Sequence, residues 1–562
     1  MRNDGVIVMF RQSQDKQMTM NDRLVFANEQ TRKAVDGSRA KLVGDIIYPN
    51  VDEAKFASLF SEKGSRPNIE IAQYVSALVL KRMYNLSDEN LMEFLRCGAL
   101  NFQYALHTTQ DERQPLSQSS LTRFRRGVET YNAEHGCDLI KEEFERISRE
   151  MAVEMGVLHT DPNAGEEDSA PIIVRMDSME IEAHAKAMTR LEILYMTIVV
   201  MLRYLLKKGF DSIIPEQLGH YTEEGDHNKV LYYRAEEDKK AGIQDQRVAE
   251  AVREMLLMEE ALKSNFSDAL LLKIPEYQVF QRVLAEQTQV NEEGERVPRD
   301  KKEISANSVQ NPFDATVTYR YKRGPHHGHV LNVAEACDDE GNGIIIHATL
   351  EPNTQSDRRM AEEYVEQLPD DGPRQIMPVD GAYNSEALND LAKKKNVEIQ
   401  TTSLTGKTPE DIVGDFVLNE EGTTVLRCPA GNEPVSCKYN QNNGQITAAM
   451  PDNCCANCPH RDECKAKVNE KKNKSTVRVS GKMVARAKQA RKFTTEEGKK
   501  NANRRNGVEG IMSVMRRKYG VDHIPVFGLD RLGNWIWTTL LSYNLVKYQK
   551  YKATLKKQLS AA

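Results

Sequence analysis

The 562-residue sequence lacks an uninterrupted apolar run of the roughly 18 residues that a membrane-spanning helix needs. Its nearest approach is the stretch at 191–206, which an arginine interrupts and which is more typical of a buried helix. The first 16 residues contain a short apolar patch, but neither a signal-peptide core nor a cleavage site. We therefore expect a cytoplasmic protein without a membrane partner.

The sequence also lacks an overall excess of positive charge, because its net charge is −6. This average conceals an asymmetry: residues 465–562 carry 24 Lys and Arg against 6 Asp and Glu, a local charge of +18, which leaves −24 for the rest. Such a basic tail is a candidate phosphate-binding surface, although a solvated helical face has a similar composition.

Cysteine is scarce, with nine residues, and it is unevenly distributed. Cys97, Cys137 and Cys337 are isolated, as ordinary core cysteines are. The other six lie between residues 428 and 464. In the absence of a secretory signal, metal ligation explains this group better than disulfides do.

The cysteine group predicts a structural Zn²⁺ site, for which four thiolates at suitable spacing are enough. The candidate ligands are Cys428, Cys455, Cys458 and Cys464, with Cys437, Cys454 and His460 as alternatives. Reduced cysteines packed in a small knuckle are the competing interpretation.

The length predicts several domains. No internal repeat is evident, and an acidic linker at 159–170 follows the first helical region. The expected divisions are an N-terminal segment at 1–60, a helical DNA-binding domain at 61–156, an α/β core at 171–407 with a helical insertion at about 186–300, a Cys-rich insertion at 408–470, and basic C-terminal helices at 471–562.

Helical periodicity dominates the region from Asn68 to Gly156. Apolar residues at 69–84 are spaced for one buried face, and Ser87 is a plausible N-cap for the next helix. A third helix, which opens near Pro115 and Ser117, exposes hydroxyls and arginines, as a helix-turn-helix-like DNA reader would, although other surface helices share this pattern. Its expected exposed residues include Ser120, and its predicted DNA contacts are Ser119, Thr122, Arg123, Arg125 and Arg126.

The central region alternates strand and helix patterns. One strand is predicted to end at or just after Asp177, and further strands begin near Ala315, His329 and Gly343. A helix capped by Ser356 or Asp357 follows, and then a strand that ends at Asp380. Three successive antiparallel strands, a helix, and a strand parallel to the first predict a mixed α/β fold with an RNase H-like core.

The carboxylates of this sheet suggest a specific chemistry. Two-metal phosphoryl transfer needs Asp or Glu side chains that converge on two divalent ions. Asp177 and Asp380 would lie on neighbouring strands at one edge of the sheet. Glu509 is the candidate third carboxylate; a simple pairing with Arg505 four residues earlier is its structural alternative. Two acidic residues near a predicted helix start, Glu496 and Glu497, are rivals for that place.

Several segments resemble a known family. GSRPNIEIAQYVSALVLKRMYNLSDENLMEFLRC with PLSQSSLTRFRR, VDGAYNSEALNDLAKKKNVEI, and RRNGVEGIMSVMRRKYG are similar to blocks of bacterial insertion-sequence DDE transposases, in particular the insertion sequence 1182 group. The resemblance extends from about residue 64 to 545. It implies a catalytic and Mg²⁺-binding triad of Asp177, Asp380 and Glu509, two Mg²⁺ or Mn²⁺ ions, and cysteines that brace the insertion.

The family resemblance also implies DNA as partner, both element ends and target, and a homodimer or larger assembly on DNA. Many relatives place a Tyr and a Lys around the catalytic Glu, where this sequence has Ala502 and Arg516. The loss of the aromatic residue prevents the transfer of detailed end contacts. The basic residues expected to contact DNA are Arg505, Arg516, Arg517 and Lys518.

An RNase H-like nuclease without strand transfer would use the same triad and is one alternative function. A catalytically inert DNA-binding protein descended from a transposase is another, and the presence of all three carboxylates argues against it. ATP use is not expected, because Thr401 replaces the first glycine of a phosphate-binding loop that would end at Thr408. The histidines at 326, 327 and 329 are expected in a Gly/Pro turn rather than at a metal.

Overall fold

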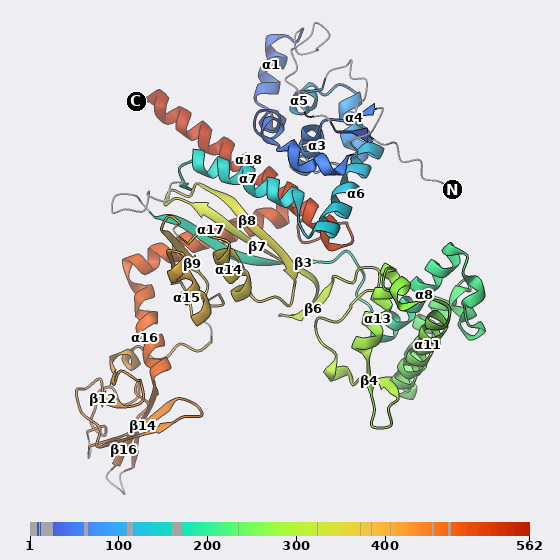
Figure 1. Cartoon of the computed structure of the whole chain (residues 1–562). Helices are drawn as coiled ribbons and strands as arrows, with labels where there is room; N and C mark the ends of the chain where they lie inside the picture. Colours follow the sequence, from blue (N-terminus) through green and yellow to red (C-terminus); the bar gives the residue numbers. More distant parts are fainter. Residues whose placement is uncertain are drawn as a thin grey trace.

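The structure of the chain is a computed structural model with a central sheet, a helical unit beside it, and two outlying units (Figure 1). It describes residues 8–10, 12, 26–60, 66–108, 116–159, 171–233, 235–322, 324–370, 372–383, 385–404, 406–451, 454–469 and 474–561. Pro115 and all of the expected acidic linker except His159 lie outside these residues.

The first helical unit is formed by short helices packed around one long buried helix. Its helices are α1 (Glu29–Asp36), α2 (Arg39–Leu42), α3 (Ile71–Met83), α4 (Asp88–Arg96), α5 (Leu100–Ala105) and α6 (Gln118–His135). Ser87 caps α4 as predicted, by accepting a hydrogen bond from the Asn90 N–H at 3.0 Å. Ser120 is buried rather than exposed, because it completes a capping box with Ser117 at the start of α6.

Helix α3 is buried on more than the single face that the sequence predicts. Nearly all of its residues are buried, including the polar Gln73 and Ser76. The reason is tertiary: the long C-terminal helix α18 (Leu529–Ala561) packs against α3 and covers the side that the periodicity assigns to solvent.

The central sheet combines antiparallel and parallel strands in a mixed α/β fold. Its strands run in the order β10-β9-β3-β7-β6, and β8 also pairs with β7. Strand β7 is antiparallel to both of its neighbours β3 and β8, whereas β9 is parallel to β3, which are the directions that the sequence predicts. The strands are β3 (Ile172–Glu182), β6 (Thr318–Tyr321), β7 (Pro325–Cys337), β8 (Gly343–Pro352), β9 (Gln375–Val379) and β10 (Val397–Thr401).

Two local predictions about this sheet are wrong. Strand β3 does not end near Asp177 but continues to Glu182, because its second half pairs with β7 in unbroken antiparallel register. The histidines at 326, 327 and 329 lie within β7, not in a turn, because β6 pairs with this part of β7 from Thr318 onwards.

Helices complete the core. Helix α7 packs against β8, and so does α18; α17 packs against β3 and β9. The helix α14 also contacts β3, and α15 packs against β10. The bounds of these helices are Leu139–Glu154 for α7, Asp357–Glu366 for α14, Glu386–Lys394 for α15 and Glu496–Tyr519 for α17.

Each outlying unit has its own apolar core. The helical one follows β3 and is built mainly from α8 (Arg190–Lys208), α11 (Gln244–Asn265) and α13 (Pro275–Gln287). The Cys-rich one has a four-stranded sheet of β13 (Ser436–Asn440), β14 (Gln445–Met450), β16 (Lys474–Ser480) and β15 (Lys467–Asn469), and α16 (Gly481–Thr494) connects it to the core (Figure 1). Within the described residues, no helix is both long and apolar enough to cross a membrane.

Candidate active site

The sheet brings the first two candidate carboxylates to corresponding positions on adjacent strands. Strands β3 and β9 pair in parallel at Ile172 with Gln375 and at Ile173 with Ile376. The same offset, continued along both strands, sets Asp177 opposite Asp380. Asp380 directly follows the last residue of β9, where the strand gives way to a turn. The paired residues lie at the start of both strands, and the two carboxylates follow five and four residues later on each strand.

Asp177 is a largely buried carboxylate in surroundings that disfavour its charged form. Its side chain is 20% exposed, and one oxygen accepts a hydrogen bond from the Ser178 N–H at 2.9 Å. Burial raises the pKa of Asp177, and the negative charges of Asp357 and Glu509 add to the rise, against the opposing effects of the Ser178 N–H and Arg505. A cation near this carboxylate would therefore be strongly favoured.

Asp380 is positioned by the chain that follows β10. The Ser403 hydroxyl donates a hydrogen bond to Asp380 Oδ1, and the Gly381 N–H donates to Ser403 Oγ at 3.1 Å. The turn is closed by a hydrogen bond from the Tyr383 N–H to the Asp380 carbonyl at 3.0 Å. These contacts fix the carboxylate at the end of its strand.

Glu509 approaches from α17, and Arg505 lies between it and Asp177. Arg505 Nη2 is 3.4 Å from Asp177 Oδ2, and its Nη1 is 3.2 Å from Glu509 Oε1. The expected pairing of Arg505 with Glu509 is present, and Arg505 also reaches the sheet. The rivals Glu496 and Glu497 lie in the exposed first turn of α17, more than three helical turns before Glu509.

A buried arginine holds α17 against the sheet. Arg175, two residues before Asp177 on β3, forms a buried ion pair with Glu335 of β7 and donates to the Arg504 carbonyl at 2.8 Å. Gly507 makes this contact possible, since a Cβ at that position would lie 1.7 Å from Arg175 Nη1. The close approach of helix and sheet therefore depends on a glycine one turn from Arg504.

Asp357 is a further carboxylate of this site, which the sequence indicated only as a helix cap. Ser356 is the N-cap of α14, and Asp357 instead accepts a hydrogen bond from the Ser178 hydroxyl at 2.7 Å. The charges of Asp177 and Asp357 both act on buried Tyr383, and burial is the main cause that raises the pKa of that phenol. No local pattern marks Asp357, because its place depends on how α14 packs on β3.

The donor chemistry of these residues fits a hard divalent cation, since Mg²⁺ prefers carboxylate oxygens. Among the described residues, however, no group of three or more His, Cys, Asp or Glu side chains is arranged to hold a metal ion. Arg505 is the cation that now bridges Asp177 and Glu509. The carboxylates therefore have the chemistry expected for Mg²⁺ without forming a closed cage.

The structure places five of the six cysteines of the insertion near one another: Cys428, Cys454, Cys455, Cys458 and Cys464. Cys455 is buried in the core of this unit, and its Sγ lies 3.8 Å from Cys454 Sγ. Burial, and then the nearby Cys458, Cys428 and Cys455, raise the pKa of Cys464 to about 11. Cys437 turns away and donates to the Val425 carbonyl at 3.6 Å, while His460 faces Glu463.

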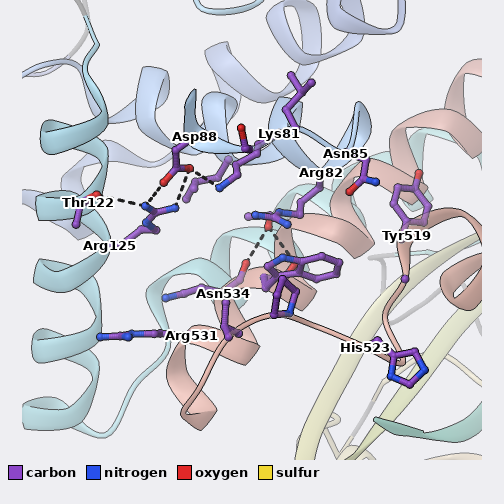
Figure 2. Close-up of a pocket in the computed structure, with 18 of the residues that line it drawn as sticks. Lys81, Arg82, Asn85, Asp88, Thr122, Arg125, Tyr519, His523, Arg531 and Asn534 are labelled. Atoms are coloured by element: carbon purple, nitrogen blue, oxygen red, sulfur yellow. Dashed lines mark hydrogen bonds and ion pairs between the residues drawn. The ribbon is translucent and has the colours of Figure 1, made fainter. Parts of the chain in front are cut away.

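The residues predicted to contact DNA divide into three groups. A cavity of about 800 Å³ is lined by Thr122, Arg125 and Arg126 from α6 together with residues 516–518 at the end of α17. Figure 2 shows Thr122 and Arg125 in this lining. Ser119 and Arg123 do not line this cavity. Arg505 points instead to the carboxylates. Two segments that the sequence separates by nearly 400 residues thus share one surface.

Comparison with protein families gives two matches within the chain. Residues 427–549 match the family described as "Transposase DDE domain", and residues 30–127 match "Transposase domain (DUF772)". Both matches are to transposases. Together they support an insertion-sequence transposase, without distinguishing its group.

The DDE-domain match includes Glu509 and the cysteine cluster, while the DUF772 match includes α3 to α5 and the first half of α6. Asp177 and Asp380 lie outside both matched regions. Neither curated proteins nor solved structures give a match.

Proposed function

We propose that this protein is a DNA transposase that cuts at the ends of its own element and joins the freed ends to target DNA. The observation that supports the proposal is that Arg505 joins Asp177 of β3 to Glu509 of α17, with Glu509 inside a region that matches a transposase DDE domain. The strand order and directions support an RNase H-like core for this site. The resemblance of the sequence blocks favours the insertion sequence 1182 group.

In this proposal Asp177, Asp380 and Glu509 hold two Mg²⁺ or Mn²⁺ ions. Bound divalent ions supply activation of the attacking oxygen and stabilisation of the leaving oxygen. The reaction is phosphoryl transfer in two steps: water attacks a phosphodiester at the element end, and the released 3′-hydroxyl then attacks a phosphodiester of the target. The protein itself forms no covalent intermediate.

The surrounding residues position these groups. The Ser178 N–H orients Asp177, and the Ser403 hydroxyl orients Asp380. Arg505 balances the charge of Asp177 and Glu509 until the substrate and ions are in place. Asp357 shares Ser178 with the site and acts as a positioning residue for Asp177.

The proposed partners are the inverted-repeat ends of the element and the target DNA, engaged by at least two copies of the chain because two ends must be cut together. The Cys-rich unit is proposed to bind one structural Zn²⁺ through Cys428, Cys455, Cys458 and Cys464, with Cys454 as the alternative ligand next to Cys455.

The decisive experiment is cleavage of labelled DNA that carries the element's ends, with Mg²⁺ or Mn²⁺. We expect nicking at the ends by the wild type, and its loss in Asp177→Ala, Asp380→Ala and Glu509→Ala, which should still bind DNA. Strand-transfer products would separate a transposase from a nuclease. Binding without any cutting by the wild type would instead favour an inert DNA-binding protein, and cutting that survives Glu509→Ala would contradict the triad.

A further inference from the structure

The cavity in Figure 2 lies between the N-terminal helical unit and the C-terminal helices, at the C-terminal end of α17. Its first wall is formed by α3 and α6, which contribute Lys81, Arg82, Arg125 and Arg126. Lys81 and Arg125 both form an ion pair with Asp88, whose single negative charge compensates only one of these two cations. Arg126 forms no ion pair with any described residue and remains uncompensated.

The opposite wall is formed by the end of α17 and the start of α18. It contributes Arg516, Arg517 and Lys518, which are exposed and have no acidic partner within ion-pair distance among the described residues. Burial lowers the pKa of Lys518, and the positive charges of Arg39 and Lys550 lower it further. Lys518 therefore lies in a positively charged environment, and an anion in the cavity would stabilise its charged form.

An aromatic platform lies on the floor of the cavity. The Arg82 guanidinium stacks on Trp535 at 4.3 Å from the ring centroid. Burial, with a contribution from Arg125, lowers the pKa of Arg82 to about 10. The cavity has only two acidic lining residues, Asp88 and Glu129, and both are already paired, Glu129 with Arg531 at 3.2 Å. The remaining charge of the lining is strongly positive.

The position of the cavity relative to Glu509 identifies its occupant. Arg516 follows Glu509 by two turns on α17, about 10 Å along the helix axis. That distance corresponds to roughly three phosphates along one strand of a duplex, at about 3.4 Å each along its axis. A DNA strand with one phosphate at the carboxylates would therefore carry its next few phosphates towards these cations.

We propose that this cavity is a clamp for the phosphate backbone of duplex DNA beside the cleaved bond, closed from one side by α6 and from the other by the end of α17. This inference rests on the proposed function for the identity of the polyanion. In this proposal α6 and the end of α17 contact the same DNA, so that DNA would hold the N-terminal unit and the C-terminal helices together. Lys81, Arg82 and Trp535 are part of it, although no motif of the sequence marks them.

The test is fluorescence anisotropy with a labelled 30-base-pair duplex of arbitrary sequence, measured over a range of salt concentrations. The double variant Arg126→Ser with Arg517→Ser removes one uncompensated cation from each wall. The matched control, Lys239→Ser with Lys240→Ser, removes two exposed lysines of α10 (Ala235–Ala241) in the helical unit. Thermal unfolding of both variants establishes that they fold.

We expect the wall variant to bind at least tenfold more weakly at about 100 mM salt, and the slope of log K against log [salt] to fall by about 1.8, or about 0.9 per lost phosphate contact. The control should keep the wild-type slope. Equal slopes for the two variants would overturn the proposal, as would tighter binding of duplex RNA or of heparin than of duplex DNA. Because binding is measured without cleavage, an inactive wild type that still shows this slope difference would contradict the proposed function but not the clamp.

Discussion

At the scale of single residues, Asp177 shows the cost that a buried carboxylate has for folding. Because burial, Asp357 and Glu509 raise its pKa, its charged form costs stability at every pH above that pKa, and the cost disappears as the pH falls through it. We expect Asp177→Asn to raise the free energy of unfolding by about 1 kcal/mol at neutral pH without divalent metal, while cleavage is lost. Urea unfolding in a chelating buffer measures this change.

The wild type and Asp177→Asn also test whether Asp177 binds a divalent metal ion. Addition of Mg²⁺ at many times its dissociation constant should stabilise the wild type by RT ln(1 + [Mg²⁺]/Kd) and leave Asp177→Asn unchanged. If Asp177→Asn were less stable than the wild type in the chelating buffer, the charged Asp177 carboxylate would not destabilise the fold.

Asp88 behaves in the opposite way. Although burial alone would raise its pKa, hydrogen bonds from Arg125 and Lys81 lower the pKa of Asp88 to about 2. Its contribution to stability is therefore complete above about pH 4 and is lost as the pH falls towards 2. We expect Asp88→Asn to cost about 2 kcal/mol at neutral pH, with a difference from the wild type that shrinks below about pH 4.

The comparison for Asp88 is Asp390→Asn, which removes an exposed carboxylate of α15 that lies 3.7 Å from Lys393. It should change stability by less than about 0.5 kcal/mol at all pH values. If the stability of Asp88→Asn and of Asp390→Asn depended on pH in the same way, Arg125 and Lys81 would not be the cause of the pH dependence.

At the scale of the elements, the contact of α17 with the sheet depends on a single glycine. Gly507→Ala would bring a Cβ against Arg175 and disturb its ion pair with Glu335. We expect a loss of about 2 kcal/mol or more in stability and at least a tenfold loss in cleavage rate, since Glu509 would move with the helix.

The matched control lies three residues further along the same helix. A Cβ at Gly510 meets nothing within 4 Å, so Gly510→Ala should stabilise α17 by up to about 1 kcal/mol through helix propensity. Chemical denaturation of the two variants gives the comparison. Two stabilising changes would mean that Arg175 moves aside without cost.

The Cys-rich unit makes a separate prediction about metal content. Metal analysis of the purified protein should find one Zn²⁺ per chain, and Cys458→Ser should lose it, whereas the isolated and exposed Cys97→Ser should retain it. Removal of Zn²⁺ by a chelator should increase proteolysis within residues 408–470 and leave the central sheet intact, because the unit has its own core. Wild-type protein with no zinc would favour reduced cysteines in a packed knuckle.

The elements themselves follow the sequence where the pattern is local. The apolar runs before Asp177 and Asp380 form strands, and Ser87 begins a helix, because burial periodicity and capping act over a few residues. The extension of β3 to Glu182 and the covering of α3 by α18 were not predictable, since each depends on a partner distant in sequence. For the same reason Asp357 could be identified only as a cap.

At the scale of the whole molecule, the C-terminal helix α18 joins the helical unit to the core. Asn544 is fully buried; its Nδ2 donates to Ser148 Oγ on α7 and to the Ile345 carbonyl on β8, both at 2.8 Å. Its Oδ1 accepts from the Ile345 N–H at 3.0 Å. Two residues earlier on α18, the Ser542 hydroxyl donates to the Val79 carbonyl of α3 at 2.9 Å.

We expect Asn544→Leu to cost about 3 kcal/mol, because it leaves the buried N–H and carbonyl of Ile345 without partners. Thr554→Ala, on the exposed part of α18, should change stability by less than about 0.5 kcal/mol. Denaturation followed by far-UV circular dichroism and by tryptophan fluorescence measures both. A near-neutral Asn544→Leu would show that α18 repacks without these hydrogen bonds.

The contact between Arg505 and Asp177 joins positions that are 328 residues apart in the chain. At a synthesis rate of roughly 5–20 residues per second, β3 leaves the ribosome on the order of half a minute before the helix that covers it. During that interval the apolar strands of the nascent sheet have no C-terminal helix to pack against, and they are exposed to aggregation and to chaperones. Ribosome-bound chains stalled before α17 should therefore recruit a chaperone more strongly than chains stalled after α18, and Arg505 can join Asp177 to Glu509 only after α17 has been synthesised.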